Sequence, residues 1–167
     1  MSRISASIVS RAGTKIKAMD IHQKELMLDE IYHNQPNILG LVLIQQRLRV
    51  SLQKMDFLLS LFLVCYQAMK DSGLAWPVIT EEDIKQQMDH LIASVHFDKD
   101  LNNTLQGLPL QQYVENFPEK PLLAFIQAET EIWLAETTPE ESDKNIIIAA
   151  MSLVNCIAFA TTKEQKG

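Results

Sequence analysis

The stretch from residue 37 to residue 72, NILGLVLIQQRLRVSLQKMDFLLSLFLVCYQAMKDS, contains no proline and a single glycine, Gly40. Its apolar residues recur at alternating gaps of three and four positions, which is the spacing of one face of an α-helix. Polar residues follow the same period on a second line along the stretch. We therefore predict one continuous helix over residues 38–71, with Gly73 as its C-cap.

The most apolar part of this stretch, residues 57–69, carries no charged side chain. A helix that spans a bilayer needs about twenty consecutive apolar residues, and Asp56 and Lys70 bracket a shorter run. Upstream, Arg47, Arg49 and Lys54 interrupt any longer span. The sequence therefore favours a buried helix, and we expect that the chain is not transmembrane.

The predicted helix is long for the size of the chain. At 1.5 Å per residue it would extend roughly 50 Å, whereas a compact globule of this size is about 40 Å across. Its second half also carries an additional apolar row, so that most of its circumference must be covered by other helices or by a second subunit. We predict that a second copy provides part of the cover in a homodimer. The predicted interface residues are Phe57, Leu61, Val64 and Ala68.

The rest of the chain also has helical periodicity, and no segment alternates with a period of two. We predict helices over 14–34, 80–95, 121–136 and 146–162, a helix start in the TPEE motif at 138–141, and two short helices within 98–118. No internal repeat or linker divides the sequence. We expect an all-α fold: a single domain over residues 1–167, built as a bundle of about six helices around the long central hydrophobic helix.

The first 19 residues are basic and rich in serine, and they contain no acidic residue. This composition is typical of an organellar transit peptide, or of a basic arm over residues 1–13 that contacts an anionic surface. The alternative is an N-terminal segment that docks on the rest of the chain through Ile4, Ile8 and Ile16. We favour this alternative, because basic and polar termini are common in ordinary domains.

Charge and cysteine content restrict the classes of function. The net charge of −6 opposes binding to nucleic acid, which requires clustered Lys and Arg. The charge is also uneven, because residues 1–70 are net basic and residues 71–167 are strongly acidic. The two cysteines, Cys65 and Cys156, each lie within an apolar run and form no disulfide framework, so that we expect a cytoplasmic protein.

One pattern suggests chemistry. Glu30 and His33 are spaced as half of a helical-bundle dimetal site, but the matching position on another helix has Gln87 before His90. The segment from Asp98 to Pro109 begins like a calcium loop and lacks its required glycine and glutamate. No phosphate-binding loop, nucleophile elbow or CxxC motif occurs, and we predict no cofactor.

Our leading hypothesis from the sequence is a non-enzymatic helical module for protein–protein interaction that self-associates. The alternative is a metal-dependent helical-bundle enzyme that uses Glu30 and His33.

Overall fold

The structure, a computed structural model, describes residues 2–97 and 116–164, with the side chains of 94–97 left out. The two short helices predicted within 98–118 and the calcium-type loop from Asp98 fall wholly or largely outside these residues. Helices make up nearly all of the regular structure, which confirms the predicted all-α class.

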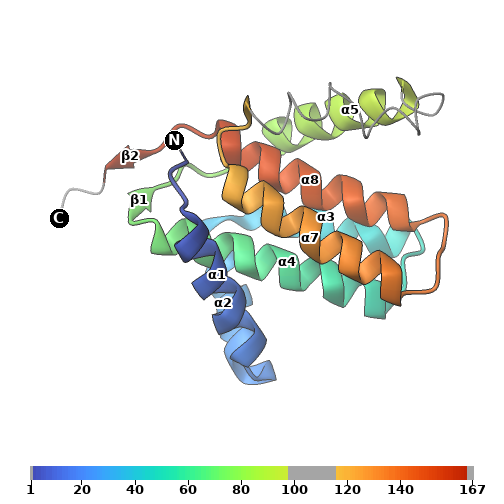
Figure 1. Cartoon of the computed structure of the whole chain (residues 1–167), viewed down its shortest axis with the longest axis horizontal. Coiled ribbons are helices and arrows are strands. Elements are labelled where there is room, and N and C mark those ends of the chain that lie inside the picture. The colour runs from blue at the N-terminus through green and yellow to red at the C-terminus, as the bar shows by residue number, and fades with distance from the viewer. Residues whose placement is uncertain (1, 98–115, 165–167) are drawn as a thin grey trace.

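The described residues form seven helices and one pair of very short strands (Figure 1). The helices are α1 (Ala6–Ala18), α2 (Ile21–Asn34), α3 (Pro36–Arg47), α4 (Leu52–Asp71), α5 (Glu81–Phe97), α7 (Lys120–Glu136) and α8 (Asp143–Phe159). Strand β1 (Leu74–Ala75) pairs antiparallel with β2 (Lys163–Glu164), so that the C-terminal end of the described chain lies beside the end of α4.

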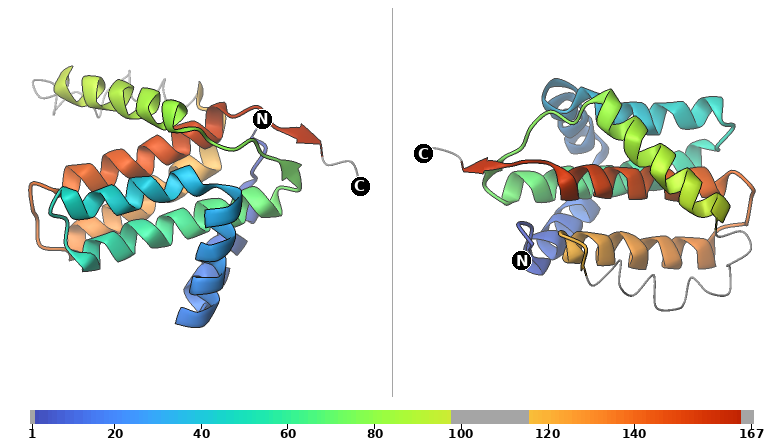
Figure 2. Two further views of the ribbon diagram at one scale, coloured as in Figure 1. Left: turned by 180° about the vertical axis from the view of Figure 1, so that it is seen from behind. Right: turned by 90° about the horizontal axis from the view of Figure 1, so that it is seen from above.

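Helix α8 is the centre of the bundle. It contacts α3, α4, α5 and α7, and most of its side chains from Ile146 to Ala158 are buried. Figure 2 shows α3, α4, α7 and α8 running roughly alongside one another, with α5 crossing obliquely over α8. Helix α1 packs across α4, and α2 projects from one side of the bundle. The buried apolar residues form one cluster.

The prediction of one continuous helix over 38–71 is wrong, because two helices, α3 and α4, occupy this stretch. The chain leaves the helix at Leu48 and begins a new one at Leu52, with Ser51 as N-cap accepting a hydrogen bond from the Lys54 N–H. Arg49 adopts a left-handed backbone conformation with φ of 63°, which ends the first helix without glycine or proline. The apolar spacing continues across the break, and for this reason periodicity alone predicts one helix.

The side chains of the predicted interface are largely covered within their own chain. Leu61, Val64 and Ala68 are buried in the core of their own chain, and Phe57 is half-buried with its ring stacked on Trp133 at 4.5 Å between centroids. Because α3 and α4 are separate helices, each is short enough to be enclosed by its neighbours. These four side chains therefore do not form an exposed face on α4.

Two other predicted helix boundaries differ in the structure. The helix predicted over 14–34 is interrupted at Met19, and Asp20 starts α2 with a capping box in which it exchanges hydrogen bonds with Gln23. The TPEE motif does not begin a helix, because α8 starts at Asp143. The polar groups of Thr138 and Glu140 instead contact Lys54 of α4.

The N-terminal segment docks on the bundle, as favoured from the sequence. Ile4 and Ile16 are buried and Ile8 is partly buried. Arg3 donates hydrogen bonds to Glu119 and to the carbonyl oxygens of Ile157, Ala158 and Ala160 at the end of α8. The guanidinium also lies 4.8 Å from the ring centroid of Trp76. Arg3 is therefore an internal cap for α8.

Candidate functional site

The candidate metal ligands Glu30 and His33 both lie on α2 and are engaged with the protein itself. The Glu30 carboxylate is 2.9 Å from the Lys70 ammonium of α4. The His33 Nδ1 atom is 2.7 Å from the Asp29 carbonyl oxygen in the preceding turn. Among residues 2–97 and 116–164, no group of three or more His, Cys, Asp or Glu side chains is placed to hold a metal ion. The described geometry therefore offers the enzyme hypothesis no ligand set.

The pKa of Glu30 is consistent with a carboxylate that is ion-paired with Lys70. Partial burial raises the pKa of Glu30, but hydrogen bonds from Lys70 and Tyr66 and the positive charge of Lys70 lower it by more, so that the pKa lies below its ordinary value. The pair stabilises the contact between α2 and α4. Gln87 and His90, the other half of the predicted pattern, lie on α5, which packs against α8.

A buried cation joins α4 to the connection before α8. The Lys54 ammonium is 2.6 Å from Asp143 and 2.9 Å from Glu140, and it also donates to the Thr138 carbonyl oxygen. Burial lowers the pKa of Lys54, but the hydrogen bonds and charges of the two carboxylates raise it above its ordinary value. This cluster contains no nucleophile and holds the two segments together. The sequence could not reveal it, since its partners are 89 positions apart.

The two thiols are buried and unpaired with each other. Burial raises the pKa of Cys65 to about 12, and burial together with the charge of Asp83 raises the pKa of Cys156 to about 12. Neither cysteine has the lowered pKa that makes a thiol nucleophilic at neutral pH.

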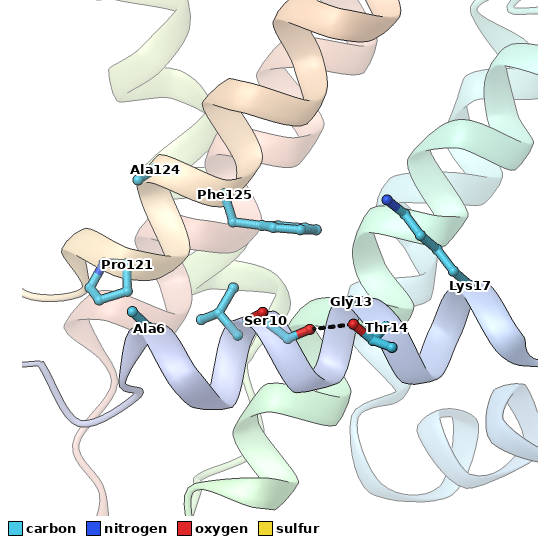
Figure 3. Close-up of a pocket in the computed structure, with 9 residues that line it drawn as sticks. Ala6, Ser10, Gly13, Thr14, Lys17, Pro121, Ala124 and Phe125 are labelled. Atoms are coloured by element: carbon cyan, nitrogen blue, oxygen red, sulfur yellow. Dashed lines mark hydrogen bonds between the residues drawn. The ribbon is translucent and has the colours of Figure 1, made fainter.

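A groove runs between α1 and α7 (Figure 3). It encloses about 470 Å³, and its surface is mainly apolar. A side chain at Gly13 would bring a Cβ atom 3.3 Å from the Phe125 ring, so that glycine allows the two helices to approach closely here. Lys17 lies at the end of the groove, 3.8 Å from Glu129. The lining residues are Ala6, Val9, Ser10, Gly13, Thr14, Lys17, Pro121, Ala124 and Phe125. Apart from Lys17 and Phe125 these side chains are short, and they provide a packing surface rather than a set of reactive groups.

The end of α3 and the beginning of α4 expose an apolar surface that the sequence prediction did not identify. Leu43 is 63% exposed and Leu52 is 71% exposed, and Ile44 and Leu48 are also exposed. We call these four residues the α3–α4 corner. Two of its members lie four positions apart, Ile44 in the last turn of α3 and Leu48 at its C-cap, and the other two flank them along the chain. The interface predicted from the sequence, at Phe57, Leu61, Val64 and Ala68, includes none of them.

None of the helices in the described ranges 2–97 and 116–164 has the length and apolarity needed to cross a membrane. The chain matches no protein-family model, and comparisons with curated proteins and with solved structures yield no match.

Proposed function

We propose that the protein is a non-enzymatic helical module for protein–protein interaction that self-associates as a homodimer through the α3–α4 corner. The observation that supports this proposal is the exposure of four aliphatic side chains at one end of the bundle. Isolated exposed apolar residues are normal on a protein surface, whereas a group contributed by one helix and the following helix start favours an interaction site.

The charges around the corner favour a second copy as the occupant. Arg47 and Arg49 lie between Leu43 and Leu52 along the chain, and Asp56 lies one turn beyond Leu52. All three are exposed, and none makes an ion pair with another described residue. A two-fold interface brings the same patch together from both subunits, so that a patch with charges of both signs beside an apolar centre is self-complementary.

We also propose that the protein works in the cytosol. Two free, buried thiols and an ordinary soluble composition support this location, since disulfides are rare in a reducing compartment. The absence of a lowered thiol pKa and the ion-paired state of Glu30 support a role without catalysis.

The test is the molar mass in solution. We expect size-exclusion chromatography with light scattering to give twice the 19.0 kDa subunit mass at micromolar concentration. Replacing both Leu43 and Leu52 by Glu places two like charges on each face of the two-fold contact, and the mass should fall to that of one subunit. Far-UV circular dichroism should be unchanged, because both side chains are exposed in the folded subunit.

The matched control is Ile21→Glu, which introduces the same charge at a side chain that is 77% exposed on α2. This variant should remain dimeric. A wild-type protein of 19.0 kDa across the micromolar range would overturn the proposal, and so would a Leu43→Glu/Leu52→Glu variant that stays dimeric.

A further inference from the structure

A second cavity lies between the loop that precedes α5, the first turns of α5 and the end of α8. We call it the α5–α8 cleft. Its volume is about 310 Å³, at the lower end of the roughly 300–1,000 Å³ that small-molecule sites occupy. Buried Ile79 and Cys156 contribute to its apolar lining, and two large apolar side chains that also line it, Val78 and Phe159, are 53% and 60% exposed. A bound apolar group would cover both of these side chains.

The loop side of the cleft is held rigidly. Gln35, which is buried at the junction of α2 and α3, donates from Nε2 to the Pro77 carbonyl oxygen at 2.7 Å. Its Oε1 atom accepts a hydrogen bond from the Ile79 N–H at 2.9 Å. Asn37 donates to the Ile79 carbonyl oxygen at 2.9 Å. These bonds fix the backbone of residues 77–79 before any ligand arrives, which lowers the entropic cost of binding.

The polar groups in the cleft favour a cation. Asp83 is the only charged residue among those that line it, and Gln86, Gln87 and Thr161 add neutral hydrogen-bonding groups. The Asp83 Oδ2 atom accepts a hydrogen bond from the Thr80 N–H at 3.2 Å, and Oδ1 has no hydrogen bond to another described residue. The Asp83 charge reaches the opposite side of the cleft, where it contributes to the raised pKa of Cys156.

Arg3 does not neutralise this site. Its guanidinium donates to the carbonyl oxygen of Ala160, which lines the cleft, but it is paired with the Glu119 carboxylate at 3.1 Å. The net charge of the whole chain, −6, also favours the approach of cations over anions.

We propose that the α5–α8 cleft binds a small organic ammonium ion whose apolar body lies between Val78 and Phe159. The ammonium group donates hydrogen bonds to the Asp83 carboxylate. The apolar body covers the exposed side chains of the loop and of α8, and the Phe159 ring also attracts the positive charge. Gln86, Gln87 and Thr161 provide further hydrogen-bonding groups for a substituted ligand.

The experiment titrates the full-length ¹⁵N-labelled protein with benzylamine at pH 7 and follows backbone amide resonances by NMR. We expect saturable shifts at Ile79, Asp83 and Phe159, with a Kd of about 1 mM for a probe of this size. Benzyl alcohol has the same shape without the charge, and it should bind roughly fivefold more weakly.

The Asp83→Asn variant should bind benzylamine no more tightly than the wild type binds benzyl alcohol. Asparagine retains a side-chain oxygen for the Thr80 N–H, so that the start of α5 is preserved. The matched control is Asp89→Asn, which removes an exposed carboxylate of α5 that does not line the cleft, and its affinity should equal that of the wild type.

Three results would overturn the proposal. They are the absence of saturable shifts up to about 20 mM probe, shifts that map to another surface, and equal affinity for benzylamine and benzyl alcohol. The comparison of the two probes uses wild-type protein alone, and it decides the matter even if Asp83→Asn fails to fold.

Discussion

At the scale of single residues, the buried thiols make the folded protein less stable at alkaline pH. The pKa of each thiol is raised from 9.0 to about 12 in the folded chain, because burial disfavours the thiolate. Well below pH 9 both the folded and the unfolded chain hold the two protons. Above pH 9 the unfolded chain loses them first, so that the free energy of unfolding falls with rising pH until the folded thiols also titrate near pH 12.

We therefore expect the urea midpoint to fall between pH 8 and pH 10.5, and the fall to be smaller in Cys65→Ala. Cys65→Ala is less stable than the wild type at both pH values, since the substitution leaves a cavity in the core. The comparison therefore uses the difference between the urea midpoint at pH 8 and the urea midpoint at pH 10.5, taken for each protein separately. An unchanged pH dependence in this variant would contradict the assigned pKa.

A thiol reagent at pH 8 should likewise modify neither cysteine until the protein is unfolded.

The ion pairs show which residue contacts the sequence could not predict. Lys54 meets Asp143 across 89 positions, and Arg3 meets Glu119 across 116. Nothing in either local pattern marks these charges as buried, because each is typical of a helix surface until its partner is known. In contrast, the Asp20–Gln23 capping box joins residues three positions apart, so that its spacing can be recognised in the sequence.

At the scale of elements, periodicity predicted the helices well and their interruptions poorly. The helices over 121–136 and 80–95 match α7 and α5 to within two residues. The breaks at Met19 and at Leu48–Ser51 were missed, since neither contains proline or glycine and the apolar spacing continues through both.

The backbone of Arg49 provides a test of the break. A left-handed conformation costs roughly 1–2 kcal/mol for a residue with a side chain and almost nothing for glycine. We expect Arg49→Gly to raise the free energy of unfolding by about 0.5–1 kcal/mol, measured by urea denaturation. If one continuous helix ran through this position, Arg49→Gly would instead lower the free energy of unfolding by about 1 kcal/mol.

The control for this prediction is Arg47→Gly, because Arg47 is the last residue of α3 and has an ordinary helical conformation. This variant should be destabilised or unchanged. If both glycine variants lose stability to the same extent, the left-handed conformation of Arg49 is not populated in solution.

At the scale of the whole molecule, the sequence predicted the all-α class and a helix over 146–162 near the position of α8, but it predicted wrongly how the apolar surface is shared among the helices. Two medium helices in place of one long helix let α8 take the centre, in contact with α3, α4, α5 and α7. The core residues Leu61, Val64 and Ala68 are covered within one subunit. Part of the apolar surface that remains exposed lies at the α3–α4 corner.

Arg3 contributes to the stability of the whole bundle. Arg3→Ala removes the hydrogen bonds to α8 and leaves the fully buried Glu119 carboxylate with only the backbone N–H groups of residues 3 and 4 as donors. We expect the free energy of unfolding to fall by about 3 kcal/mol, measured by urea denaturation. Arg11→Ala, at an exposed position of α1, should change it by less than about 0.5 kcal/mol.

The Arg3 contacts also impose an order on biosynthesis. Ala160, whose carbonyl oxygen accepts a hydrogen bond from the Arg3 guanidinium, is translated 157 positions after Arg3. Helix α1 can pack on α4 as soon as α4 has been made, but Arg3 has neither Glu119 nor the end of α8 as a partner until those residues follow. The contacts that join Arg3 to α8 are therefore among the last that the described residues can form during translation.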